Sequence, residues 1–187
     1  MARETITTNG GLVTAAMLVK NRANMWVVLG KQTAWTDEEK PDSPSQGTSD
    51  IIEPLVAIKA QTSILCREVS SGDYELLSPN DRALVYSETG YVYLELVPDE
   101  DAYEKAAKMI YIDAVYAPLV GMPEADFRIY GTYSGLIPAA GYENAEWLSP
   151  INVDSYGLLI NLSHGKVYQQ TELGRAVQIP MLIEFNF

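Results

Sequence analysis

Apolar and polar residues alternate along much of this chain, which is the pattern of half-buried β-strands. The alternation is most regular in AVQIPMLIEFNF, where every second residue from Val177 to Phe187 is apolar. Pro180 has no amide donor for a sheet ladder, so we expect this strand at a sheet edge or at a bulge. Further strands are predicted in MWVVLG, LVAIK, SILCREV, RALVY, YVYLELV, MIYIDAVYA, FRIYGTYSGL and SYGLLINL.

Turn residues between these segments predict two β-hairpins. RALVY and YVYLELV flank a turn near residues 88–90, and SYGLLINL and VYQQ flank the short segment SHGK. The second hairpin would place His164, the chain's one histidine, in a surface turn.

Helical spacing occurs near the N-terminus, where Leu12, Ala15, Ala16 and Val19 recur on one face of residues 11–22. A further short helix is predicted over residues 99–108, because acidic residues in its first turn would complement the helix dipole. We therefore predict an α+β fold, a single domain over residues 1–187 that is mostly antiparallel β-sheet with an N-terminal helix and one further short helix.

The stretch TDEEKPDSPSQGTSD contains proline, glycine and no large apolar residue, and predicts an exposed loop at about 36–50. Trp35 stands between the strand MWVVLG and this loop. Two interpretations stay open. Trp35 folds back onto the sheet and pins the start of the loop, or it is an anchor presented to a neighbouring subunit.

Composition excludes several classes of function. The chain has 25 acidic and 13 basic residues and a net charge of −12, which disfavours binding to nucleic acid. No apolar run reaches the roughly 20 residues that span a bilayer, and MARETITTNGG does not resemble a secretory signal. We expect a soluble protein that is made in a cytoplasm, with no membrane partner. The one cysteine, Cys66, is expected to be a buried, inert thiol.

No catalytic, cofactor-binding or metal-binding residues are predicted. One histidine and one cysteine do not supply an ordinary zinc site, and no G-x-S-x-G or phosphate-loop motif is present. We therefore expect no enzyme, no cofactor and no small-molecule substrate. An alternative of another class is a carbohydrate-binding or glycoside-hydrolysing module, with Glu143 and Glu146 as paired acids beside Tyr142 and Trp147.

Tyrosine is unusually frequent, at 12 residues against 3 phenylalanines. Tyr and Trp combine apolar area with a polar tip and are enriched at protein interfaces, although β-propensity alone also favours them in half-buried sheets. The candidate partner-interface residues are Trp35, Tyr91, Tyr93, Tyr130, Tyr133, Tyr142 and Trp147.

Three segments together resemble a family of tailed-bacteriophage virion proteins, the baseplate wedge subunits of contractile-tailed phages. They are MWVVLGKQTAW with the acidic loop WTDEEKPDSP, then FRIYGTYSGLIPAAG, and finally SYGLLINLSHGKVYQQTELGRAVQIPMLIEF. The chain departs from the family pattern at SHGK, where an Asn-Arg pair is more usual, and in the loop, where paired prolines are more common.

The resemblance implies a non-enzymatic virion structural protein of the tail baseplate that acts through contacts with other virion subunits during assembly. It implies location in the virion. A neck, collar or tail-completion protein of the virion is the nearest alternative.

Overall fold

A computed structural model describes residues 8–22, 24–45, 47–87, 90–118, 121–168 and 176–185. The described residues form two compact units. The first unit comprises Met1–Asn21, Thr62–Ile112 and Pro180–Phe187, and the second comprises Arg22–Gln61 and Asp113–Ile179, as far as they are described. The prediction of one domain over residues 1–187 stays a prediction.

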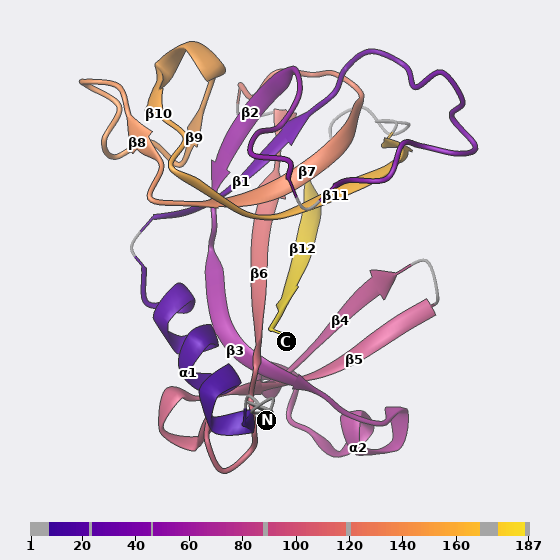
Figure 1. Cartoon of the computed structure of the whole chain (residues 1–187), viewed down its shortest axis with the longest axis vertical. Coiled ribbons are helices and arrows are strands. Elements are labelled where there is room, and N and C mark those ends of the chain that lie inside the picture. Colours follow the sequence, from indigo (N-terminus) through magenta and orange to yellow (C-terminus); the bar gives the residue numbers. More distant parts are fainter. Residues whose placement is uncertain are drawn as a thin grey trace, which may run out of the picture. The chain divides into compact units, whose positions relative to one another are not determined.

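Figure 1 shows the helices and strands, coloured from indigo at the N-terminus to yellow at the C-terminus. The helices are α1 (Asn9–Lys20), α2 (Ser71–Leu76) and the 3-10 helices η1 (Pro79–Asp81), η2 (Asp99–Asp101) and η4 (Pro150–Asn152). The strands are β1 (Met25–Gly30), β2 (Pro54–Lys59), β3 (Thr62–Glu68), β4 (Arg82–Ser87), β5 (Gly90–Val97), β6 (Met109–Tyr116), β7 (Phe127–Ser134), β8 (Ile137–Pro138), β9 (Trp147–Leu148), β10 (Val153–Ser155), β11 (Leu158–Tyr168) and β12 (Val177–Glu184).

The first unit contributes to a five-stranded sheet with the order β12-β6-β3-β5-β4. Its two sequence-neighbouring strands β4 and β5 pair antiparallel from Arg82 opposite Glu95 to Ser87 opposite Gly90, which confirms the first predicted hairpin. Cys66 lies fully buried in the apolar cluster of this sheet, and burial raises the pKa of its thiol to about 12. Its predicted burial is confirmed, and so is the edge position of β12 around Pro180.

The second unit is built on a five-stranded sheet with the order β11-β7-β1-β2-β9. Every residue of β1 is buried, because β1 lies in the middle and pairs antiparallel with both β2 and β7. This unit also contains a small two-stranded sheet of β8 and β10. The core cluster comprises Trp26, Val28, Trp35, Ile51, Ala57, Ile129, Tyr133, Leu136 and Leu148.

The predicted α+β class is confirmed, with mostly antiparallel sheet, an N-terminal helix and one further short α-helix. The position of the second helix is corrected. Residues 99–108 form only η2 followed by turns, and Ala106 has a positive φ of 52°, which a right-handed helix does not contain. The α-helix is α2, where the Ser70 hydroxyl accepts a hydrogen bond from the Asp73 backbone N–H at 3.1 Å.

The second predicted hairpin is wrong. SHGK lies inside β11, which runs without a turn from Leu158 to Tyr168. The register on β7 shifts between His164, opposite Ile129, and Tyr168, opposite Phe127, so the extra residues form a bulge. Glycine inside a strand marks such irregularities as well as turns. His164 is therefore a half-buried strand residue and not a turn residue.

A buried carboxylate on β5 of the first unit binds one cation on β3 and one in the turns after η2, and it makes the stability of this unit depend on pH. Glu95 is 6% exposed and accepts hydrogen bonds from Arg67 Nε at 2.6 Å and Lys105 Nζ at 2.8 Å. Burial raises the pKa of Glu95, but the bonds from Lys105 and Arg67 outweigh it and hold the pKa below its ordinary value.

Glu95→Gln is expected to lower the free energy of unfolding by about 1–3 kcal/mol at pH 7, because both cations lose their charged acceptor. A carboxylate whose pKa is lower in the folded than in the unfolded state stabilises the fold at pH values above its unfolded-state pKa. This contribution is lost as the pH falls through the folded-state pKa. Urea unfolding at pH 7 and at a series of acidic pH values measures the difference, which should shrink below about pH 4. Glu104→Gln, at an exposed position, is the control and should change little. A difference that is independent of pH would contradict the assignment.

Candidate functional site

The connection between β1 and β2, residues 31–53, is the longest loop that the sequence predicted, and its two ends are tied together. Glu53 accepts hydrogen bonds from the Thr33 backbone N–H at 2.9 Å and from the Thr33 hydroxyl at 2.8 Å. The Thr33 backbone bond holds the pKa of Glu53 below its ordinary value. Lys31 donates its backbone N–H to the Ile52 carbonyl at 2.8 Å and its ammonium group to the Thr33 hydroxyl. The base of the loop is thus closed by its own residues.

Trp35 folds inward from this loop. Its side chain is 9% exposed and belongs to the core cluster of the second unit. The indole Nε1–H donates to the Gly165 carbonyl of β11 at 2.9 Å, and the ring lies 5.2 Å from the His164 ring. Lys31 Nζ stands 5.3 Å from the indole centroid. The structure therefore supports the first interpretation of Trp35, in which it pins the start of the loop to the sheet.

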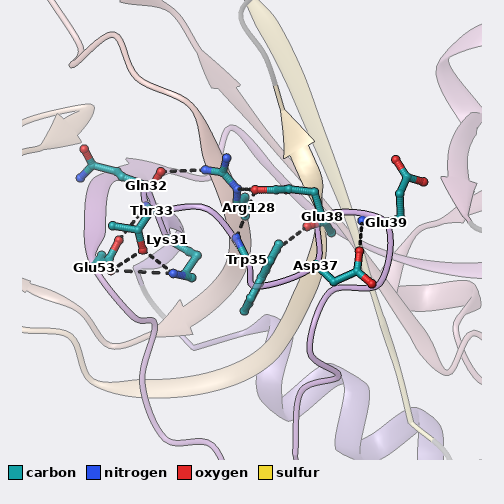
Figure 2. Close-up of polar contacts among 10 residues, drawn as sticks. Lys31, Gln32, Thr33, Trp35, Asp37, Glu38, Glu39, Glu53 and Arg128 are labelled. Atoms are coloured by element: carbon teal, nitrogen blue, oxygen red, sulfur yellow. Dashed lines mark hydrogen bonds and ion pairs between the residues drawn. The ribbon is translucent and has the colours of Figure 1, made fainter.

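An ion pair holds the next turn of the loop against β7. Arg128 is 8% exposed. Its Nε donates to Glu38 Oε1 at 2.7 Å, and its Nη1 donates to the Gln32 carbonyl at 2.7 Å. The same Glu38 oxygen accepts the Trp35 backbone N–H at 3.1 Å. Figure 2 shows Arg128 pointing from its strand between Gln32 and Glu38. Glu38 Oε2 is buried and has no hydrogen-bond partner within the described part of the chain.

Two further contacts fasten the middle and the end of the loop. His164 Nδ1 lies 2.5 Å from the Asp42 carbonyl oxygen. The Tyr133 hydroxyl accepts the Ile51 backbone N–H at 2.9 Å and donates to the Asp50 carboxylate at 3.0 Å. Burial raises the pKa of Tyr133, so it stays a neutral donor at physiological pH. The loop is exposed to solvent over most of residues 36–50, yet it is fastened to β7 and β11 at several points.

A glycine on β7 makes room for the returning end of the loop. A Cβ added at Gly131 would lie 2.6 Å from the Asn161 carbonyl oxygen and 3.2 Å from Ile51 Cδ1. Gly30 has the same role on β1, where a Cβ would lie 2.4 Å from Ile51 Cγ2. Ile51 can thus approach the sheet backbone only because both positions lack a side chain.

A shallow pocket of about 290 Å³ lies between the loop and β11. Its described lining residues are Pro44, Ser45, Thr48 and the strand residues Leu159, Ile160, Asn161 and Leu162. None of these side chains is a carboxylate, imidazole, thiol or amine, so they offer no acid or base that would activate the Ser45 or Thr48 hydroxyl. The pocket suits packing or hydrogen bonding rather than catalysis.

The structure divides the seven predicted interface residues into three groups. Tyr91 and Tyr142 are exposed, at 61% and 44%. Tyr93, Tyr130 and Trp147 are half-buried. Trp35 and Tyr133 are buried in the core, at 9% and 1%, and so offer no surface to a partner in this conformation. The interface prediction therefore applies only to the other five.

Sequence reasoning missed residues that matter to this site. Arg128 stands in the apolar strand FRIYG, and a charged residue in a central strand indicates a buried partner. The partner, Glu38, is 90 residues away in the chain, so the pairing itself has no local sequence pattern. Outside this site, in the first unit, sequence reasoning also missed Leu84 and Tyr86 of β4, which are 41% and 73% exposed; Tyr86 contacts Tyr91 edge to face at 5.5 Å. Their alternation with buried Ala83 and Val85 was visible in RALVY.

Glu143 and Glu146, the paired acids of the glycoside-hydrolase alternative, lack the environment of a catalytic acid. Glu143 is exposed, and hydrogen bonds from its own backbone N–H and that of Gly141 hold its pKa below its ordinary value. A glycosidase acid needs a raised pKa to remain protonated. Glu146 is exposed and lies 3.9 Å from Lys59. Within the described ranges, no group of three or more His, Cys, Asp or Glu could hold a metal ion.

The helices within the described ranges are all too short or too polar to cross a membrane.

Comparison with known proteins decides the family. A family model described as "Baseplate wedge 3 tail fiber network component" matches residues 4–185, nearly the whole chain. The chain belongs to this family. "Virion protein 3" of Enterococcus phage phiEF24C is 31% identical to it over 160 residues, which cover 82% of this chain and 81% of the relative.

Membership in the baseplate wedge 3 tail fiber network component family makes this chain a structural protein of the bacteriophage virion, with a role in the tail and baseplate. The resemblance drawn from the three sequence segments is thereby confirmed. All three meet in the loop site, because Trp35 donates to Gly165 of β11 and Arg128 of β7 binds Glu38.

Proposed function

We propose that this chain is a non-enzymatic wedge component of the phage tail baseplate that works by contacts with other virion subunits during assembly. The observation that carries the proposal is the family match over residues 4–185. Its setting would be the host cytoplasm during assembly and the virion afterwards.

The loop site supports a structural role. Most of its buried polar groups make their hydrogen bonds inside the chain, as Arg128 does with Glu38 and Gln32 and Trp35 does with Gly165. Glu38 Oε2, which has no partner within the described residues, is an exception. A site that binds a substrate leaves such groups directed at the ligand. A firmly held loop instead presents a surface of fixed shape, which reduces the ordering cost of association.

The exposed aromatic residues are the proposed contacts. Tyr91 and Tyr142 are exposed, and tyrosine is among the residues that carry most binding energy in interfaces. Neck, collar or tail-completion function in the virion is the alternative within the same class, and no specific contact in the described residues favours it.

Co-expression with the products of neighbouring tail genes tests the proposal. We expect the chain to elute with at least one of them in size-exclusion chromatography, at a higher mass than the chain alone. A glycan array and hydrolysis assays should give no signal. Polysaccharide hydrolysis that disappears in Glu143→Gln or Glu146→Gln would overturn the proposal.

A further inference from the structure

The edge strands of the two five-stranded sheets differ in how well they are protected. An exposed strand edge offers unpaired backbone groups to any other strand, and proteins usually block it with proline, bulges, charge or a very short strand. β12 carries Pro180, β11 has two shifts of register, and β9 has only two residues. Each of these three edges therefore has a recognisable device against further pairing.

β4 is the edge that lacks such a device beyond its first residue, Arg82. It is six residues long, RALVYS, without proline or lysine, and its pairing with β5 runs without a shift of register. No other strand pairs with it within the described ranges. Figure 1 shows β4 and β5 as a two-stranded arm, with α2 close to its base. A further strand could extend the sheet along β4.

The solvent face of this arm is apolar. Leu84 and Tyr86 of β4 are 41% and 73% exposed, and Tyr91 of β5, opposite Tyr86, is 61% exposed. The alternate residues Ala83 and Val85 are buried in the core of the first unit. An added strand would thus find backbone groups along its length and an apolar row on one face, the combination used in strand addition.

Charge at the start of β4 indicates the kind of partner. Asp81 is exposed, and the Glu75 side chain is 72% exposed. The nearby cation, Arg82, is already used, because it lies 3.6 Å from Glu75, donates to the Tyr74 carbonyl at 3.1 Å and stacks over the Tyr74 ring. A second copy would bring a further net charge of −12 and no free cation in its own β4. A basic partner is favoured over a second copy.

We propose that β4 is a strand-addition edge on which another virion subunit docks an extended segment, apolar at alternate residues and carrying Lys or Arg beside Glu75 and Asp81. The inference rests on the proposed function for the identity of that partner as a virion subunit. The chemistry of recognition rests on β4 alone.

A defined peptide tests the edge. The probe is a fluorescein-labelled ten-residue peptide of alternating Val and Thr flanked by Lys, titrated into the full chain and followed by fluorescence anisotropy. Matched probes carry Glu in place of Lys, or Pro in place of the central Val. We expect the Lys peptide to bind with a Kd at least tenfold lower than either matched probe, and to slow hydrogen exchange of β4 amides.

Two protein variants locate the binding. Leu84→Ser with Tyr86→Ser should raise the Kd of the Lys peptide at least tenfold, whereas Ile151→Ser, at a residue 88% exposed in η4, should leave it within twofold. No binding, equal binding of the proline peptide, or an unaffected double variant would overturn the inference. So would sedimentation of the chain as a dimer that the double variant abolishes, since β4 would then pair with a second copy. The peptide assay needs no virion, so its failure leaves the proposed function standing, and absence of the chain from tails would refute the proposed function alone.

Discussion

Trp35→Ala is expected to lower the free energy of unfolding of the isolated chain by about 3–5 kcal/mol, the usual cost of removing a large buried aromatic residue. The side chain is 9% exposed, packs in the core cluster and donates its indole N–H to Gly165. For a chain of this size such a loss corresponds to a fall in Tm of roughly 6–20 °C. Differential scanning calorimetry measures it.

Trp35→Phe separates packing from the hydrogen bond, because it keeps an aromatic ring and loses the donor to Gly165. It should cost less than Trp35→Ala. Tyr142→Ala, at a residue 44% exposed, is the control and should change stability by about 0.5 kcal/mol or less. If Trp35→Ala left the Tm unchanged and abolished binding to a partner subunit, the anchor interpretation of Trp35 would be correct instead.

Arg128→Met is the change with the second largest expected effect, a loss of about 2–4 kcal/mol in the free energy of unfolding. Arg128 is 8% exposed and binds Glu38 at 2.7 Å, and Glu38 Oε2 is already buried without a hydrogen-bond partner in the described part of the chain. Removing the cation leaves the Glu38 carboxylate partly buried and without the cation of its ion pair. Urea unfolding at pH 7 measures the change.

A double-mutant cycle gives the control. Glu38→Gln removes the charge that Arg128 neutralises, so Arg128→Met should cost less in the Glu38→Gln background than in the wild type. Equal costs in both backgrounds would mean that Arg128 stabilises through its bond to the Gln32 carbonyl and its packing, and not through Glu38.

The sequence predicted the parts of this fold that depend on local pattern. Alternation in RALVY and YVYLELV predicted the β4–β5 hairpin, and Pro180 predicted an edge or a bulge in β12, which lies at an edge. Residues 99–108 were mistaken for a helix because acidic residues suit both a helix start and the short turn of η2. SHGK was mistaken for a turn because glycine marks bulges as well as turns, and only the register on β7 distinguishes the two.

The loop site was beyond prediction because its contacts join residues far apart in the chain. Trp35 donates to Gly165 across 130 residues, and Tyr133 binds Asp50 across 83. The sequence identified Trp35 and Tyr133 as unusual aromatics but could not assign them to the core or the surface. Three-dimensional packing assigned both to the core.

The most direct test of the proposed role is the composition of purified phage tails. Particles are separated into heads and tails, and each fraction is analysed by quantitative mass spectrometry after chemical cross-linking. A baseplate component should be enriched in the tail fraction at a fixed ratio to other baseplate proteins, with cross-links to at least one of them. Its absence from tails, or a location confined to the head and neck, would contradict the account.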